Sequence, residues 1–154
     1  MTKPGPVTIL MVDDNIDEIY LARRQVRNHG ILNQFVSEQC PESLFSTLEE
    51  LYSNTPGNNV LILLDINMPR MNGLETLKAI RSHEEFSSLP VIMFSASDEE
   101  DDMSDAIRLG ANGYLVKPFA IEPFLSVLGG LPQMKYHLFP GPLGSAPVRY
   151  HLVQ

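Results

Sequence analysis

Residues 60–69 read Val-Leu-Ile-Leu-Leu-Asp-Ile-Asn-Met-Pro. The first five form an unbroken apolar run that ends in an acid, which is typical of a strand covered on both faces in a parallel sheet. Similar runs occupy residues 7–12, 91–94 and 114–116, and the pattern of residues 34–38 predicts a weaker strand. The chain therefore carries five candidate strands.

Helical periodicity fills the intervals between these runs. Apolar residues recur at spacings of three and four in five segments; Gly30 offers the first segment a left-handed stop, and Pro41 opens the second. The apolar stripes are Ile16, Ile19, Ala22 and Val26; Leu44, Phe45, Leu48, Leu51 and Tyr52; Leu74, Leu77 and Ile80; Met103, Ala106 and Ile107; and Phe124, Leu125 and Leu128. Strands that alternate with helices predict an α/β fold with one parallel sheet.

The composition fits one globular domain and excludes several classes of partner. The chain has 154 residues, of which 44% are hydrophobic, enough for a core. Its 11 Lys and Arg against 19 Asp and Glu give a net charge of −8 with no basic cluster, so we expect neither nucleic acid nor an anionic membrane as a partner. The single cysteine, Cys40, the start without a signal-like segment and the shortness of every apolar run predict a cytoplasmic protein.

The last part of the chain has a different character. We expect the folded domain to occupy residues 7–130, because residues 131–154 lack periodicity and are rich in proline and glycine. Little regular structure is expected in this extension. Residues 141–145, Gly-Pro-Leu-Gly-Ser, are similar to the remnant that a common fusion-cleavage vector leaves, so we assign the extension no function.

Polar residues follow the candidate strands directly. Asp13 and Asp14 follow the first strand, Asp65 the third, Ser95 the fourth and Lys117 the fifth. Ligands of parallel α/β sheets bind at the carboxyl ends of the strands, so we expect these side chains to meet there. Three neighbouring carboxylates repel one another, and a hard divalent cation held by oxygen ligands, such as Mg²⁺, would relieve that repulsion.

This set of residues suits phosphoryl transfer. Asp65 can attack phosphorus as an ionised carboxylate and form an aspartyl phosphate without a general base. Lys117 supplies a compact positive charge for a phosphoryl oxygen, and Ser95 supplies a hydroxyl donor. Such transfer depends mainly on positioning and on charge stabilisation, which these groups provide.

In their order along the chain, these residues resemble the receiver domain of two-component response regulators, of the chemotaxis-regulator type. The resemblance spans about residues 7–130 and implies a flavodoxin-like three-layer sandwich whose five parallel strands lie in the order 2-1-3-4-5. The matching stretches are Asp13-Asp14, residues 63–73 (Leu-Leu-Asp-Ile-Asn-Met-Pro-Arg-Met-Asn-Gly), Ser95-Ala96, Gly113-Tyr114 and Lys117-Pro118-Phe119.

The resemblance also implies roles for single residues. Asp65 would be the phosphorylation site, and Lys117 and Ser95 would act on the phosphoryl group. Mg²⁺ would be bound by Asp14, Asp65 and the backbone carbonyl of Asn67, with Asp13 acting through a water. The bond between Lys117 and Pro118 would be cis.

A switch and a set of partners follow from the same resemblance. Ser95 and Tyr114 would move on phosphorylation and remodel the surface of the fourth helix, fifth strand and fifth helix, through which a homodimer could form. Asn67 and Ser97 stand at the two positions that tune dephosphorylation. The phosphodonor would be a sensor histidine kinase. The long segment between the acid pair and Asp65 resembles that of stand-alone receivers that partner phytochrome kinases.

Several other interpretations remain open. A metal-dependent phosphatase of the haloacid-dehalogenase type also forms an aspartyl phosphate, but it carries a second Asp where this chain has Asn67. In a flavodoxin-like electron carrier, Asp13 and Asp14 would repel the phosphate of FMN. The chain could instead be a receiver fragment of a larger signalling protein, or a receiver that only binds partners. Asp13 or Asp14 taken alone could merely cap the first helix.

Overall fold

The structure is a computed structural model in which strands and helices alternate along the chain. It describes residues 7–31, 33–54, 59–68, 71–96 and 99–131, and the backbone of 135–139 and 149–153. The elements up to residue 129 are β1 (Val7–Val12), α1 (Ile16–Asn28), β2 (Phe35–Glu38), the 3-10 turn η1 (Pro41–Ser43), α2 (Leu44–Asn54), β3 (Asn59–Asp65), α3 (Gly73–Ser82), β4 (Val91–Ser95), α4 (Glu100–Arg108), β5 (Gly113–Val116) and α5 (Ile121–Gly129).

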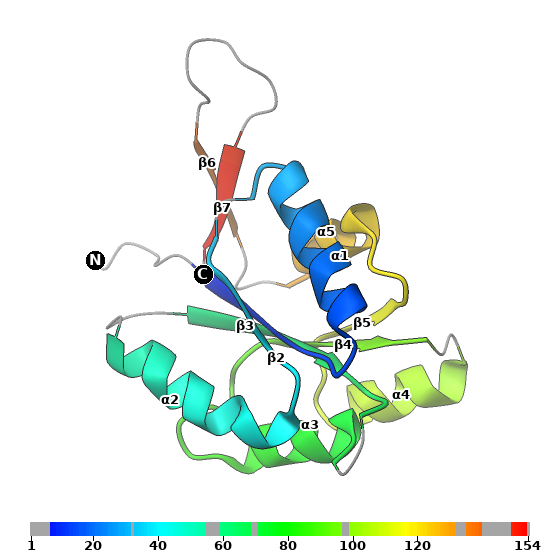
Figure 1. Ribbon diagram of the computed structural model, residues 1–154. Helices are drawn as coiled ribbons and strands as arrows, with labels where there is room; N and C mark the ends of the chain where they lie inside the picture. The colour runs from blue at the N-terminus through cyan, green and yellow to red at the C-terminus, as the bar shows by residue number, and fades with distance from the viewer. Residues whose placement is uncertain are drawn as a thin grey trace.

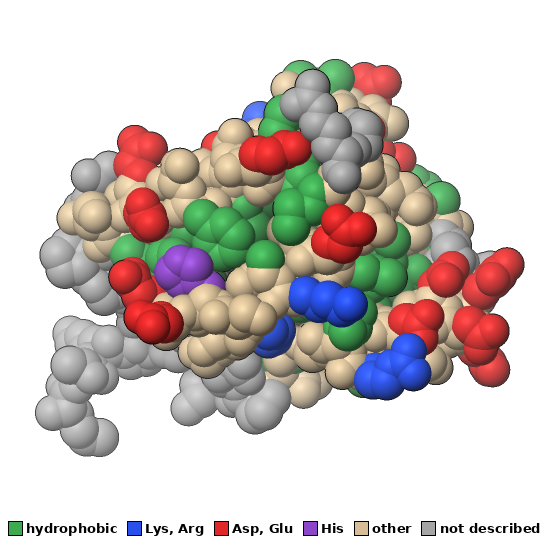
Figure 2. Space-filling model, turned by 90° about the horizontal axis from the view of Figure 1, so that it is seen from below, with side chains coloured by type: hydrophobic (Ala, Val, Ile, Leu, Met, Phe, Trp, Pro, Cys, Tyr) green, Lys and Arg blue, Asp and Glu red, His purple; other side chains and the backbone are tan. Residues whose placement is uncertain are grey.

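These strands form one parallel sheet in the order β2-β1-β3-β4-β5, which confirms the flavodoxin-like order. Helices α1 and α5 cover one face of the sheet, and α2, α3 and α4 cover the other (Figure 1). Figure 2 views the second face, where acidic side chains are spread widely and basic ones are few, in keeping with the net charge of −8. No helix among the described residues is long and apolar enough to cross a membrane.

The central strands supply two separate cores. Ile9 and Leu61 point to the core under α1 and α5, whereas Leu10 and Ile62 point to the core under α2, α3 and α4. Successive residues of a strand face opposite sides of a sheet, so a sheet covered on both sides needs apolar residues at every position. The continuous apolar runs of the sequence follow from this arrangement.

Two asparagines start helices at the carboxyl edge of the sheet. The side chain of Asn15 accepts a hydrogen bond from the backbone N–H of Asp17 at 2.9 Å, and that of Asn72 accepts one from Glu75 at 2.9 Å. Both are N-cap interactions that satisfy free donors of the first helical turn. Asn15 is the N-cap of α1, so neither member of the acid pair is needed for that purpose.

Some details of the predicted helices are wrong. Ile16 and Ile107, assigned to apolar stripes, are 63% and 52% exposed. Ile16 begins α1 at the edge of the sheet, where the helix has little sheet to cover. On α4, Ala106 faces the core, and Ile107, the next residue, points about 100° away from it around the helix. Pro41 opens a 3-10 turn, and the α-helix begins only at Leu44.

The extension contains more regular structure than expected. Strands β6 (Lys135–Phe139) and β7 (Arg149–Val153) pair in antiparallel fashion as a second sheet, with His137 opposite His151. The expectation of little regular structure is therefore wrong. Both segments contain tyrosine and other strand-favouring residues, and this local preference prevails although prolines lie close by.

Candidate functional site

Three carboxylates lie together at the carboxyl edge of the sheet. Asp13 follows β1 and Asp65 ends β3, and the parallel pairing of these two strands sets them side by side. Both are buried, at 0% and 1% exposure, whereas the neighbouring Asp14 is exposed. One carboxylate oxygen from each of the three residues lies within 4.8 Å of the others. The predicted acidic cluster is thus present.

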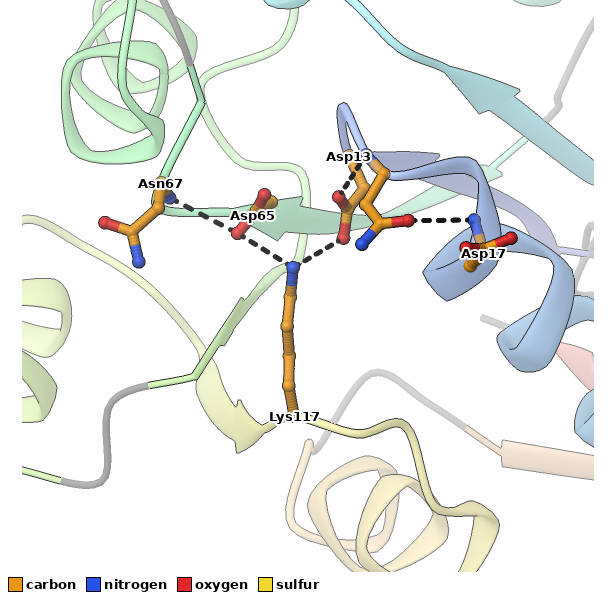
Figure 3. A network of polar contacts seen from close by, with 6 residues as sticks. Asp13, Asp17, Asp65, Asn67 and Lys117 are labelled. Carbon is orange, nitrogen blue, oxygen red and sulfur yellow. Dashed lines mark hydrogen bonds and ion pairs between the residues drawn. The ribbon is translucent and has the colours of Figure 1, made fainter.

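Lys117 reaches this cluster from the loop that follows β5. Its Nζ atom lies 3.0 Å from Oδ2 of Asp13 and 3.3 Å from Oδ1 of Asp65 (Figure 3). The backbone N–H of Lys117 donates to the carbonyl of Ser95 at 2.7 Å, which ties the start of the loop to the end of β4. The Lys117–Pro118 bond is cis, as the resemblance implied.

The charges at this edge are unbalanced. Burial and the nearby charge of Asp13 raise the pKa of Asp65 to about 7, although Lys117 and the N–H of Asn67 act in the opposite direction. Burial alone would lower the pKa of Lys117, but the hydrogen bond and charge of Asp13, followed by those of Asp65, raise it overall. The lysine therefore stays charged at neutral pH, and in the part of the chain that the structure describes it is the one cation paired with this cluster of three carboxyl groups.

The donor set fits a hard divalent cation. Among the described residues, the Oδ2 atom of Asp65 is buried and has no hydrogen-bond partner. A buried carboxylate oxygen left in this state is costly, and a bound cation would satisfy it. Only oxygen atoms are offered by Asp13, Asp14 and Asp65, and carboxylate oxygens are the ligands that Mg²⁺ and similar ions take. The cluster could therefore hold a metal ion.

The loop after β3 folds closely around Asp65. The backbone N–H of Asn67 donates to Oδ1 of Asp65 at 3.2 Å, and the N–H of Gly73 donates to the carbonyl of Ile66 at 2.8 Å. A Cβ atom at Gly73 would clash with the backbone carbonyl oxygen of Asp65. Glycine at this position lets α3 begin directly against the strand that carries the buried carboxylate.

The remaining predicted residues lie at different distances from the cluster. Ser95 ends β4 and is 1% exposed. Phe94 pairs with Asp65, so Ser95 lies on the strand next to Asp65, one position further along. Tyr114 lies in the interior of β5, half-buried against the core under α4. Ser97 lies outside the described residues.

Two further residues contact Lys117 or the loop that follows it, and neither belongs to the motifs that identify the site. The ring of Phe94 lies 5.2 Å from the lysine Nζ, in a cation–π contact. Gln25 of α1 makes hydrogen bonds to the backbone on both sides of Ala120, in the loop that follows the lysine. The available signals in the sequence were the aromatic residue beside Ser95 and a glutamine next to the apolar stripe of the first helix.

Comparisons with known proteins agree with this site. Residues 9–128 match the family model of the response regulator receiver domain. Chemotaxis protein CheY of Pseudomonas aeruginosa is 33% identical over 114 residues, which are 74% of this chain and 86% of that protein. Among solved structures, the bacteriophytochrome response regulator AtBRR matches with a TM-score of 0.73 at 27% identity, covering 92% of this chain and 100% of that one.

A third relative was solved with a metal ion. The Mn²⁺-bound response regulator Rcp1 matches with a TM-score of 0.63 at 28% identity, covering 81% of this chain and 91% of that one. The family match extends from β1 to the end of α5 and includes every strand end that contributes to the acidic cluster. The chain belongs to the response regulator receiver domains of bacterial two-component signalling systems.

Proposed function

We propose that this receiver domain accepts a phosphoryl group on Asp65 from the phosphohistidine of a sensor histidine kinase. The observation that carries the proposal is the setting of Asp65: a buried carboxylate 3.3 Å from the Nζ atom of Lys117, within the three-carboxylate cluster. The protein would be a signalling phosphoacceptor that catalyses only its own phosphorylation and dephosphorylation.

In the proposed reaction, a carboxylate oxygen of Asp65 attacks phosphorus and a new oxygen–phosphorus bond forms. The bond from phosphorus to the histidine nitrogen breaks, and the nitrogen keeps the electron pair. Lys117 stabilises the charge on the phosphoryl oxygens and remains protonated throughout. Ser95, at the adjacent strand end, donates its hydroxyl to the same group.

Mg²⁺ is the proposed cofactor. Asp14, Asp65 and the backbone carbonyl of Asn67 would hold it, with Asp13 in its outer sphere. The ion would neutralise the acidic cluster and stabilise negative charge on the phosphoryl group. The raised pKa of Asp65 supports this role, because a cation favours the ionised form that attacks phosphorus.

The consequences of phosphorylation are proposed in the same way. Ser95 and Tyr114 would change position and remodel the face formed by α4, β5 and α5, which is also the candidate surface for a homodimer. Exposed Ile107 on α4 and Val116 on β5 support a binding role for this face. Asn67 and Ser97 would tune the rate of dephosphorylation.

We propose residues 7–130 as the receiver, supported by the family match over 9–128, and residues 131–154 as an extension. The similarity to a bacteriophytochrome response regulator supports a phytochrome as the sensor kinase. A cytoplasmic location is part of the same proposal.

Intact mass spectrometry after incubation with acetyl phosphate tests this function. We expect one added phosphoryl group that requires both Mg²⁺ and Asp65, so Asp65→Asn stays unmodified. Asp105→Asn on α4, outside the acidic cluster, is the matched control and is modified like the wild type. Modification of Asp65→Asn at another residue would contradict the assignment, and sustained turnover of small phosphate esters would indicate a phosphatase.

A further inference from the structure

Gln25 links α1 to the loop between β5 and α5. Its Nε2 atom donates to the carbonyl of Phe119 at 2.7 Å, and its Oε1 atom accepts from the N–H of Ile121 at 2.9 Å. These two backbone groups lie on either side of Ala120, the N-cap residue of α5, which has no side chain able to cap the helix. Gln25 therefore supplies from another helix the cap that the loop itself lacks.

The loop that Gln25 holds begins at Lys117. Only Pro118 separates the lysine from Phe119, which is 2% exposed. The Phe119 ring packs edge-on against the ring of Phe94, with 6.1 Å between the ring centroids. The centroid of the Phe94 ring in turn lies 5.2 Å from the lysine Nζ. The backbone after the lysine and the charged end of its side chain are thus fixed by connected contacts.

We propose that Gln25 is a positioning residue for Lys117. By fixing the backbone that follows the lysine, it holds the ammonium group between Asp13 and Asp65, where it can meet a phosphoryl group. The role rests on the proposed function, since phosphoryl transfer is what a correctly placed lysine would serve. A lysine side chain has a long flexible stem, so its reach depends on where its backbone is anchored.

The chemistry of glutamine suits this role. Its amide offers a donor and an acceptor at the same time, and the loop requires one of each. Glutamate at this position would keep the bond from Ile121 and lose the bond to Phe119. Methionine has a similar length and helix propensity but would make neither bond. These substitutions therefore form a graded series.

The test measures two quantities on the full chain: the rate of Asp65 phosphorylation by acetyl phosphate, and the dissociation constant for Mg²⁺. For Gln25→Met we expect a rate at least about tenfold lower, since small misplacements of a catalytic group are costly. We also expect Mg²⁺ to bind about twofold or more tightly, because a displaced lysine no longer competes for the carboxylates. Gln25→Glu should fall between Gln25→Met and the wild type in both measurements.

Arg24→Met, at the adjacent exposed position of α1, is the matched control and behaves like the wild type in both assays. A phosphorylation rate for Gln25→Met within twofold of the wild type would overturn the proposal. A parallel loss of phosphorylation and Mg²⁺ affinity would also overturn it, because that pattern indicates damage to the fold. If Gln25→Met does not fold, Gln25→Glu carries the test.

The same experiment separates this inference from the proposed function. A wild-type protein that acetyl phosphate does not modify at Asp65 would contradict the function. The Mg²⁺ titration then decides the inference alone. Tighter binding by Gln25→Met supports the positioning of Lys117, and unchanged or weaker binding overturns it.

Discussion

The two ends of the sheet both hold charged side chains, but the hydrogen-bonding groups of these side chains are satisfied to different degrees. At the amino end, all five N–H groups of Arg81 donate hydrogen bonds of 2.7–3.0 Å, to the carbonyls of Ser87, Leu89 and Gly110 and the side chain of Asn112. At the carboxyl end, Lys117 pairs with Asp13 and Asp65 in a cluster of three carboxylates. Among the described residues, Oδ2 of Asp65 there has no hydrogen-bond partner. The hydrogen-bonded arginine ties two connections of the fold together, whereas the acidic cluster could hold a cation and is where we propose that a phosphoryl group is accepted.

Removing the arginine should have the largest effect on stability. Arg81→Met leaves three backbone carbonyls of the α3–β4 and α4–β5 connections without the donor that Arg81 supplies, and it removes one of the two donors to Oδ1 of Asn112. We therefore expect a loss of about 3 kcal/mol in the free energy of unfolding. Urea denaturation measures it. Arg108→Met is the control: its exposed ion pair with Asp105 should contribute less than about 0.5 kcal/mol. Equal losses of stability in Arg81→Met and Arg108→Met would contradict the special role given to the hydrogen bonds of Arg81.

At the carboxyl end of the sheet, removing a charged side chain should raise the free energy of unfolding and not lower it. Without divalent cations, Asp65→Asn should stabilise the protein at pH 8 by about 1 kcal/mol, because it removes a charge that burial and Asp13 disfavour. This energy is set low because solvent screens part of the interaction between the charges of the site. Thermal denaturation in the presence of a chelator checks this result. A destabilised Asp65→Asn would show that this end, too, is optimised for stability.

The pH dependence of stability should follow from the same carboxyl group. In the folded, metal-free protein the pKa of Asp65 is about 7, above its usual value of 3.8. As pH rises between these values the unfolded chain loses this proton before the folded one does, so the stability contributed by Asp65 falls across that window. Denaturation curves from pH 4 to 8 should show the decline in wild type relative to Asp65→Asn. Saturating Mg²⁺ should reduce the difference.

A smaller effect is expected at Phe94. Phe94→Leu removes the ring beside Lys117 and should slow phosphorylation by acetyl phosphate about threefold, in line with a cation–π contact of less than 1 kcal/mol. Phe86→Leu is the control, because Phe86 is equally buried and lies in the other core. Both variants should lose similar stability. Equal phosphorylation rates would show that the ring only fills space.

The residues that directly follow apolar runs could be predicted from the sequence, whereas the side chains that bond to distant backbone groups could not. Asp13, Asp65 and Lys117 each directly follow an apolar run, and parallel strands bring such positions to one edge. Arg81 and Gln25 are bonded to backbone groups 29 and 94 residues away, and no local pattern marks such partners. Motifs therefore identify the residues of the acidic cluster and Lys117, and leave out residues that contact them through distant parts of the chain.

Exposure was also harder to predict than secondary structure. His83 belongs to none of the apolar stripes of the sequence, yet it is half-buried. Its ring stacks on Phe45 and Phe86, with ring centroids 5.0 and 4.6 Å apart. Periodicity places a residue on one side of a helix, but whether that side is covered depends on neighbouring elements. Ile16 is the opposite case. It belongs to an apolar stripe but is exposed, because α1 begins at this residue, at the edge of the sheet.

The division of the central strands between two cores has a consequence for how such a protein diversifies. Ile9 and Leu10 are neighbours in sequence but pack in different cores. Substitutions in separate, non-contacting clusters combine almost additively, so variation beneath α1 and α5 hardly constrains variation beneath α2, α3 and α4. Sequence change on one side of the molecule is therefore nearly independent of change on the other, while the sheet between the two cores keeps the acidic cluster and Lys117 in place.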